Sequence, residues 1–281
     1  MSSENDFQEG MRIDMEQLIV LGTGNAVVTK CFNTCFALRK DDQYWLVDTG
    51  GGNGILSALE KAEINVADIH DIFITHEHCD HLLGIVWMIR VIATAMKKGG
   101  YEGNCNIYCH SGLVSVIDTI ARLTIQGKFY KMLGNRIHLV PLEDGDHRTI
   151  IGYDVEFFDI HSTKAKQFGF TLRLENGKKL TCAGDEPYNE QNYEQVRGSD
   201  WLLHEAFCLA SQADIFKPYE KHHSTVKDAC KLAARLQIPN LVLWHTEDKN
   251  LEHRKELYLE EGRKYYSGNL YVPYDLEQIA L

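Results

Sequence analysis

The chain has 281 residues, of which 29 are Lys or Arg and 40 are Asp or Glu, so its formal net charge is −11 at pH 7. Its hydrophobic fraction of 44% and charged fraction of 25% are those of a globular protein and exclude an intrinsically disordered chain. The acidic total also excludes a protein that holds nucleic acid mainly by neutralising phosphates over its whole surface. Its 13 histidines are the most distinctive feature of the composition, and their positions become the main guide to function.

The N-terminal segment, residues 1–17, is polar and lacks the apolar core of a secretory signal, which predicts a flexible leader. Residues 18–281 are expected to form a single domain, since they contain no repeats or low-complexity tracts. The longest apolar stretch, Leu82–Met96, is interrupted by Arg90 and is shorter than a membrane span. We therefore expect a cytoplasmic protein without a membrane segment, whose eight cysteines remain reduced.

Apolar β-branched runs predict strands, and periodic apolar patterns predict helices. In the first half, the predicted strands are Leu18–Leu21, Cys35–Leu38, Tyr44–Val47, Ile72–Thr75 and Asn106–Cys109, and the predicted helices are Ile55–Ala62, Leu82–Lys98 and Leu113–Leu123. Short strands and a hairpin follow over 137–180, then strands Trp201–His204 and Leu241–Trp244 and helices Ser224–Leu236 and Glu252–Tyr265. Two runs of strands, each followed by helices, predict an α/β fold of two mixed sheets packed face to face with helices outside.

The strongest motif follows the predicted strand that ends at Thr75 and reads His76-Glu77-His78-Cys79-Asp80-His81. Neutral imidazoles and carboxylates are ligands that divalent metals such as zinc prefer. Four such side chains within six residues predict a metal site instead of a merely polar loop.

Three later strands each end at a further candidate ligand, namely His161, Asp185 and His245. With these residues the sequence resembles the metallo-β-lactamase superfamily, whose fold is an αββα sandwich with metals at the edge between the two sheets. By this resemblance, one metal is bound by His76, His78 and His161. A second is bound by Asp80, His81 and His245, and Asp185 bridges both.

The resemblance implies two divalent ions, with zinc expected and manganese or iron as alternatives. Such a pair can share a bridging hydroxide that is nucleophilic at neutral pH. The oxygen-reducing di-iron members usually carry Glu where this chain has His78, so His78 favours hydrolysis over electron transfer.

Several segments resemble ribonuclease Z and its phosphodiesterase relatives more than lactamases. They are Leu21–Ala26 with Asn33 and Thr34, His204–Phe207 in a His-Glu-Ala segment, His223–Thr225 in a His-Ser-Thr loop, and Tyr271–Leu276 as the terminal strand. We expect His223 to contact the phosphate and protonate the departing oxygen. Glu205 is expected to hydrogen-bond His223 and so keep it protonated and aimed. Asp80 is also expected to orient the hydroxide.

Two departures separate this chain from the tRNA-processing enzymes. Those enzymes insert a tRNA-gripping arm between the ligands that match His161 and Asp185, which are only 24 positions apart here. Gly51–Gly54 also replaces the family's usual Glu-Gly-Thr-Gln loop. Together with the charge, these departures favour a small or cyclic nucleotide, or a short RNA, as the phosphodiester substrate.

Several alternatives stay open at the level of sequence. The chain could be a true ribonuclease Z, a thioesterase or lactonase-like hydrolase, or a catalytically silent ligand-binding module. Met96–Gly103, or Lys164 with Lys166, could replace the missing arm, although both read equally as solvated turns. The apolar face of Leu82–Met96 is either core or the interface of a homodimer.

Overall fold

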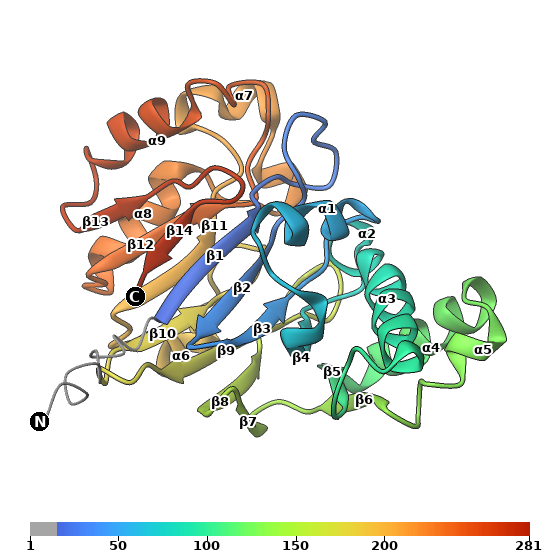
Figure 1. Cartoon of the computed structure of the whole chain (residues 1–281). Helices are drawn as coiled ribbons and strands as arrows, with labels where there is room; N and C mark the ends of the chain where they lie inside the picture. The colour runs from blue at the N-terminus through green and yellow to red at the C-terminus, as the bar shows by residue number, and fades with distance from the viewer. Residues whose placement is uncertain (1–15) are drawn as a thin grey trace, which may run out of the picture.

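Two β-sheets of seven strands each pack face to face in the computed structural model, which describes residues 16–281 (Figure 1). The segment predicted as a flexible leader lies outside the described residues, except for Glu16 and Gln17, which open the first strand. Helices cover the outer face of each sheet, so the layers follow the order αββα. This arrangement confirms the predicted metallo-β-lactamase sandwich.

The first sheet combines an antiparallel half with a parallel half. Its strands lie in the order β14 (Gln278–Ala280), β1 (Glu16–Gly22), β2 (Cys35–Lys40), β3 (Gln43–Val47), β4 (Ile69–Ile74), β5 (Cys105–His110) and β6 (Ile137–Leu142). Neighbours from β14 to β3 are antiparallel, and those from β3 to β6 are parallel.

The second sheet repeats this plan. Its order is β13 (Asn269–Tyr271), β12 (Asn240–Trp244), β11 (Trp201–Glu205), β10 (Lys179–Cys182), β9 (Phe168–Arg173), β8 (Tyr153–Asp159) and β7 (His147–Ile150). Strands β7 to β10 are antiparallel and β10 to β13 are parallel. Each sheet therefore has parallel strands that end at a common edge.

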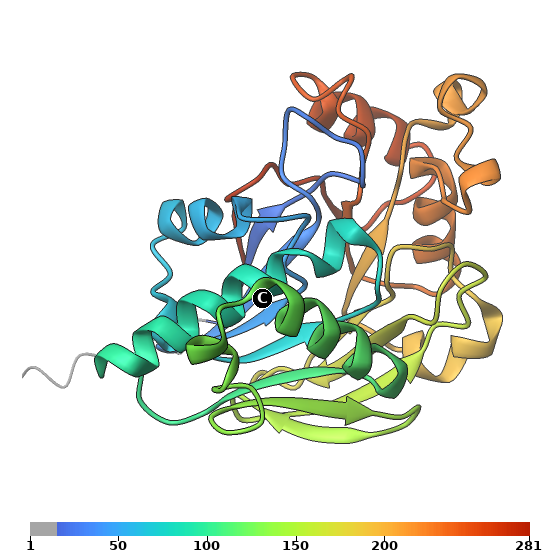
Figure 2. The same cartoon turned by 90° about the vertical axis from the view of Figure 1, so that its right-hand side faces the viewer.

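The helices divide between the two outer faces. On the first sheet lie α1 (Gly54–Lys61), α2 (Cys79–Leu82), α3 (Gly84–Lys98), α4 (Ser111–Thr124) and α5 (Gly127–Tyr130), and Figure 2 shows α3 and α4 side by side. After β10 come α6 (Tyr193–Val196), α7 (Ala213–Phe216), α8 (Val226–Arg235) and α9 (Arg254–Gly262), of which α6, α8 and α9 bury residues against the second sheet. Short 3-10 turns are η1 (Val66–Asp68), η2 (Glu190–Asn192), η3 (Ala210–Gln212) and η4 (Tyr219–Lys221).

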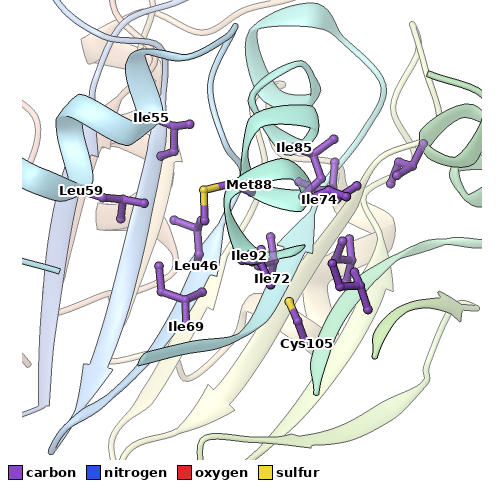
Figure 3. Packing of buried hydrophobic residues seen from close by; sticks show 14 of the residues in the cluster. Leu46, Ile55, Leu59, Ile69, Ile72, Ile74, Ile85, Met88, Ile92 and Cys105 are labelled. Carbon is purple, nitrogen blue, oxygen red and sulfur yellow. The ribbon is translucent and has the colours of Figure 1, made fainter. Parts of the chain in front are cut away.

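Strand β1 shows why the fold needs three apolar layers. Leu18 and Val20 point into the core between the sheets, while Ile19 and Leu21 point into the core under α1 and α3. Successive side chains of a strand face opposite sides, so a continuous apolar run is buried on both faces. Figure 3 shows the outer core, where isoleucines of β4 meet apolar side chains of α3.

Helix α3 accounts for the long apolar stretch of the sequence. The single helix predicted over Leu82–Lys98 is interrupted, because α2 ends at Leu82 and α3 begins at Gly84. A Cβ at Gly84 would lie 1.9 Å from the Thr49 carbonyl oxygen, so only glycine fits this approach. Taken together, Cys79–Lys98 is long and apolar enough to cross a membrane, but 56% of its apolar window is buried inside the fold. The apolar stripe of this helix is therefore core.

The predicted terminal strand over Tyr271–Leu276 is wrong. Only Tyr271 belongs to β13, and the terminal strand is β14, three residues in length. Pro273 lacks the N–H that a strand would donate, and Leu276 has φ +72°, outside the strand region. This segment instead supplies the Pro273 carbonyl to the buried Arg254 and the Asp275 carboxylate to Thr23 and Phe32.

Candidate metal centre

Polar side chains gather at the edge where the parallel strands of both sheets end. His76 to His81 follow β4, Asp185 follows β10 by three residues, and His245 follows β12 directly. The carboxyl ends of parallel strands are the usual place for ligand sites in open sheets, because loops there can converge from several strands. Six of the seven predicted ligands lie together at this edge.

The first group consists of His76, His81 and Asp185, whose ligand atoms all lie within 4.8 Å of one another. Asp185 Oδ2 is 3.7 Å from His76 Nε2 and 3.5 Å from His81 Nε2. His78 joins this group, since its Nδ1 lies 2.9 Å from His76 Nε2.

The second group consists of Asp80, His81 and His245. Asp80 Oδ2 lies 3.4 Å from the Nε2 atoms of both histidines, and these two nitrogens are 3.4 Å apart. Asp185 Oδ2 is also 3.5 Å from His245 Nε2 and therefore lies between the two groups.

The hydrogen-bond partners of the imidazole Nδ1 atoms fit these groups to divalent ions. His81 Nδ1 donates to Asp48 at 2.7 Å, and His76 Nδ1 lies 2.9 Å from the Thr75 hydroxyl, which itself donates to Asp48. A neutral imidazole with its proton on Nδ1 presents the Nε2 lone pair to the carboxylates, and a cation is the partner that such a set of atoms needs.

His161 is the predicted ligand that the structure does not bring into either group. It follows β8 with a left-handed backbone at φ +57°, and its N–H donates to Asp159. Within residues 16–281, its half-buried side chain forms no hydrogen bond or ion pair with the other six.

Asp48 is a site residue that the sequence analysis overlooked. It follows β3 directly, is buried, and accepts hydrogen bonds from the Thr75 N–H and hydroxyl as well as from His81. It therefore holds the metal loop and orients one imidazole. The sequence does contain a signal for Asp48, because a potential ligand after an apolar strand is the pattern that identified Asp185 and His245.

Burial and charge act against each other on the titratable groups of this edge. Burial would raise the pKa of Asp80 and Asp185, but adjacent imidazoles outweigh it and hold both pKa values well below the usual range. Burial lowers the pKa of His76 far below its usual value. Burial would lower the pKa of His81 as well, but the carboxylates of Asp48 and Asp80 outweigh burial and raise this pKa well above its usual value.

His223 and Glu205 lie beside the metal groups, as predicted, but they are not in hydrogen-bond contact. Glu205, at the end of β11, is fully buried, and its Oε2 is 3.6 Å from His223 Nδ1. Its other oxygen accepts the Ser224 N–H. The His223 ring stacks on Phe207 at 5.0 Å and 7° and lies 5.0 Å from the His245 ring. Neither Glu205 Oε2 nor His223 Nδ1 has another partner within the described residues.

Two loops meet at the rim of this edge. The Thr163 hydroxyl lies 2.9 Å from His222 Nδ1, and Lys164 Nζ donates to the Lys221 carbonyl. The buried Glu186 accepts from Ser162 and Thr163 and fixes the first loop. Of the two predicted arm substitutes, Lys164 therefore lies at the site rim, while Lys166 covers the Phe168 ring.

The other arm substitute, Met96–Gly103, lies at the opposite end of the sheet. Tyr101 donates to the carbonyl of Ile69, which opens β4, whereas the metal loop follows the far end of that strand. Helix α3 starts near the metal loop and rises roughly 20 Å before Gly99 ends it. This segment therefore lies away from the metal edge.

A sequence model of one protein family, described as anti-Pycsar protein Apyc1, matches residues 16–262. Among curated relatives, ribonuclease Z of Listeria monocytogenes is 26% identical over an alignment that covers 92% of this chain and 97% of the relative. The resemblance predicted from the histidine motifs is thereby confirmed.

Solved structures agree on the fold. The metallo-β-lactamase fold protein YhfI of Bacillus subtilis superposes with a TM-score of 0.76 at 15% identity and covers 95% of this chain and 99% of its own. The short form of human tRNase Z superposes with a TM-score of 0.72 at 21% identity, covering 94% and 98%. The fold and the relatives together identify a metallo-hydrolase.

Proposed function

This chain belongs to the anti-Pycsar Apyc1 family, and from that premise we propose that it is a dinuclear zinc phosphodiesterase acting on a small or cyclic nucleotide. The observation that carries the proposal is the pair of donor groups that share His81 and have Asp185 between them. Beside them lies a histidine outside both groups that can transfer a proton, His223.

Each donor group is assigned one ion. His76 and His78 would hold the first, with Asp185 shared between both ions and with His161 as a further ligand that would have to turn inward from its half-buried position. Asp80, His81 and His245 hold the second, and manganese or iron are the alternatives to zinc. Two divalent ions in such a site supply a nucleophile at neutral pH and neutralise the charge on the phosphate oxygens. Asp80, which reaches both His81 and His245, is assigned the orientation of that nucleophile.

We assign to His223 the protonation of the departing oxygen. The parallel stack on Phe207 fixes the plane of its ring, and Glu205 Oε2 lies 3.6 Å from Nδ1. A protonated ring directs Nδ1–H toward this buried carboxylate and leaves Nε2–H for the substrate. Loss of a general acid of this kind lowers the rate about 10²- to 10⁴-fold.

The architecture supports a small substrate over a whole tRNA precursor. Between His161 and Asp185 the chain forms the β9–β10 hairpin, so no arm projects there. Two loops meet at the rim through the contact of the Thr163 hydroxyl with His222 Nδ1 at 2.9 Å. On an acidic chain the ions attract phosphate locally, which suits one phosphodiester better than a long polyanion.

We extend the proposal to a homodimer. Leu83 and Trp87 lie at the start of α3, next to the metal loop, and are 38% and 44% exposed. Exposed large apolar side chains so close together are more common at subunit contacts than on an isolated surface.

The test compares His223→Ala with the unaltered protein on a bis-aryl phosphate and on cyclic mononucleotides, with zinc content measured in both. We expect the variant to keep two ions per chain and to lose turnover by at least a hundredfold. His253→Ala, at an exposed position of the same residue type, serves as the control. Unchanged hydrolysis by His223→Ala would exclude the assigned role, and cleavage of a tRNA precursor in preference to cyclic nucleotides would identify a ribonuclease Z instead.

A further inference from the structure

A large cavity lies on the outer side of the second sheet, away from the metal edge. Its volume is about 790 Å³, and it is lined by Arg173, Lys179, Arg197, Arg235, Glu190 and Tyr193, among others. Lys179 opens β10, whereas Asp185 follows its other end, so the two sites are separated by roughly 20 Å of extended chain. Tyr193 and Glu194 of α6 and Lys179 of β10 line it, and in Figure 1 these two elements lie at the opposite end of the sandwich from α2.

The cavity concentrates positive charge on a chain whose net charge is −11. Four cationic side chains line it, against the carboxylates of Glu190 and Glu194. Those two carboxylates pair with Arg235 and Arg197.

Of the four cations that line the cavity, Arg173 and Lys179 form no ion pair within residues 16–281. Arg173 donates to the Gly177 carbonyl, and Lys179 Nζ donates to the Arg197 carbonyl at 3.1 Å. Partial burial lowers the pKa of Lys179, and the positive charges of Arg173 and Arg197 act in the same direction, against the carboxylate of Glu156. An anion placed between Arg173 and Lys179 would relieve this repulsion.

Tyr193 supplies a different kind of contact. It lines the same cavity and is 46% exposed, although a side chain of this size is commonly more buried. An exposed aromatic ring beside cationic groups is the combination that binds a base and its phosphate in nucleotide sites.

We propose that this cavity is a second binding site, separate from the metal edge, for a nucleoside monophosphate. The phosphate lies between Arg173 and Lys179, and the base stacks on Tyr193. The volume matches that of small-molecule sites.

The test is calorimetric titration of the metal-loaded, full-length protein with adenosine 5′-monophosphate. We expect two sites per chain in the unaltered protein and in His223→Ala. In Arg173→Glu we expect one site to weaken at least tenfold. Arg122→Glu carries the same charge change on α4 and serves as the control, with both sites retained. Tyr193→Ala should weaken the same site about tenfold, because base stacking contributes about 1–3 kcal/mol per base.

Four results would overturn the proposal. They are unchanged binding in Arg173→Glu, equal affinity of that site for adenosine and its monophosphate, equal affinity for inorganic phosphate, and tighter binding of a ten-nucleotide RNA through the same side chains. The last result would identify a polynucleotide surface. Since binding is measured without turnover, a failure here is separate from a failure of the proposed phosphodiesterase reaction.

Discussion

Replacing Asp48 with Asn tests whether a residue outside the donor groups controls metal binding. Asp48 accepts three hydrogen-bond donors, which are the Thr75 N–H at 2.9 Å, the Thr75 hydroxyl, and His81 Nδ1–H at 2.7 Å. An amide has only one oxygen. If that oxygen keeps the bonds to Thr75, the amide NH₂ faces His81 Nδ1–H, and two donors oppose each other.

His81 can escape this clash by moving its proton to Nε2, but Nε2 is the atom that lies 3.4 Å from Asp80 and 3.5 Å from Asp185. The change therefore removes a lone pair from both donor groups. Loss of such an outer partner costs about 10- to 100-fold in metal affinity. This corresponds to about 1.4–2.8 kcal/mol of binding free energy.

Competition of the protein with a zinc-chelating dye measures this loss directly. Asp71→Asn is the matched control, because Asp71 also accepts side-chain hydrogen bonds on β4, from Asn106 and Tyr108, but touches no histidine. We expect Asp48→Asn to weaken zinc binding within this range and Asp71→Asn to leave it unchanged. Equal zinc affinity in Asp48→Asn and the unaltered protein, with both folded, would refute the tautomer argument.

Further changes probe the metal, the packing of the core and the cap of α8. Removal of metal by a chelator should lower the unfolding temperature measured by calorimetry, since ions present at 1,000 times their dissociation constant stabilise the folded state by about 4 kcal/mol; an unchanged temperature would contradict a resident metal. Trp45→Ala should lower the free energy of unfolding by about 3–5 kcal/mol in denaturant titration, because this fully buried ring packs against Phe73 and Phe170. Leu123→Ala, at a 73% exposed position, should change the free energy of unfolding by no more than about 0.5 kcal/mol, and equal losses would contradict the assignment of the core. Thr225→Ala should cost about 1 kcal/mol in the same titration, because the Thr225 hydroxyl and Asp228 form the capping box that starts α8; no loss would mean that the cap is dispensable.

Sequence patterns predicted the layers of this fold because its strands are buried on both faces. A run such as Leu18–Leu21 has no polar position, which distinguishes a central strand from a surface strand. Two kinds of feature were not predictable in this way. The break at Gly84 depends on the Thr49 backbone, which is distant in sequence, and the course of Tyr271–Leu276 depends on the buried Arg254.

The site was predictable to the extent that each residue follows a strand. His76 to His81, Asp185 and His245 were found because short apolar strands lead into them. The relation of Glu205 to His223 was predicted as a hydrogen bond, whereas the structure places the atoms 3.6 Å apart. Spacing in sequence can place two side chains at one edge, but the stack of Phe207 on His223, which sets the ring plane, arises only from tertiary packing.

Backbone conformation connects Asp48 with the candidate ligands. Asp48, His161 and His245 each follow a strand at this edge, and each has a left-handed backbone, with φ of +57°, +57° and +56°. A residue with a Cβ loses roughly 1–2 kcal/mol in this region, which glycine would avoid. Gly184, just before Asp185, adopts the same turn with φ +82°, so the edge can accept glycine where no side chain is required. Where a strained backbone persists at a position that glycine could occupy, contacts of the side chain offset the strain. For Asp48 these contacts are the three hydrogen bonds that it accepts. We predict that His161, which has the same backbone conformation, gains side-chain contacts by turning toward the metal edge.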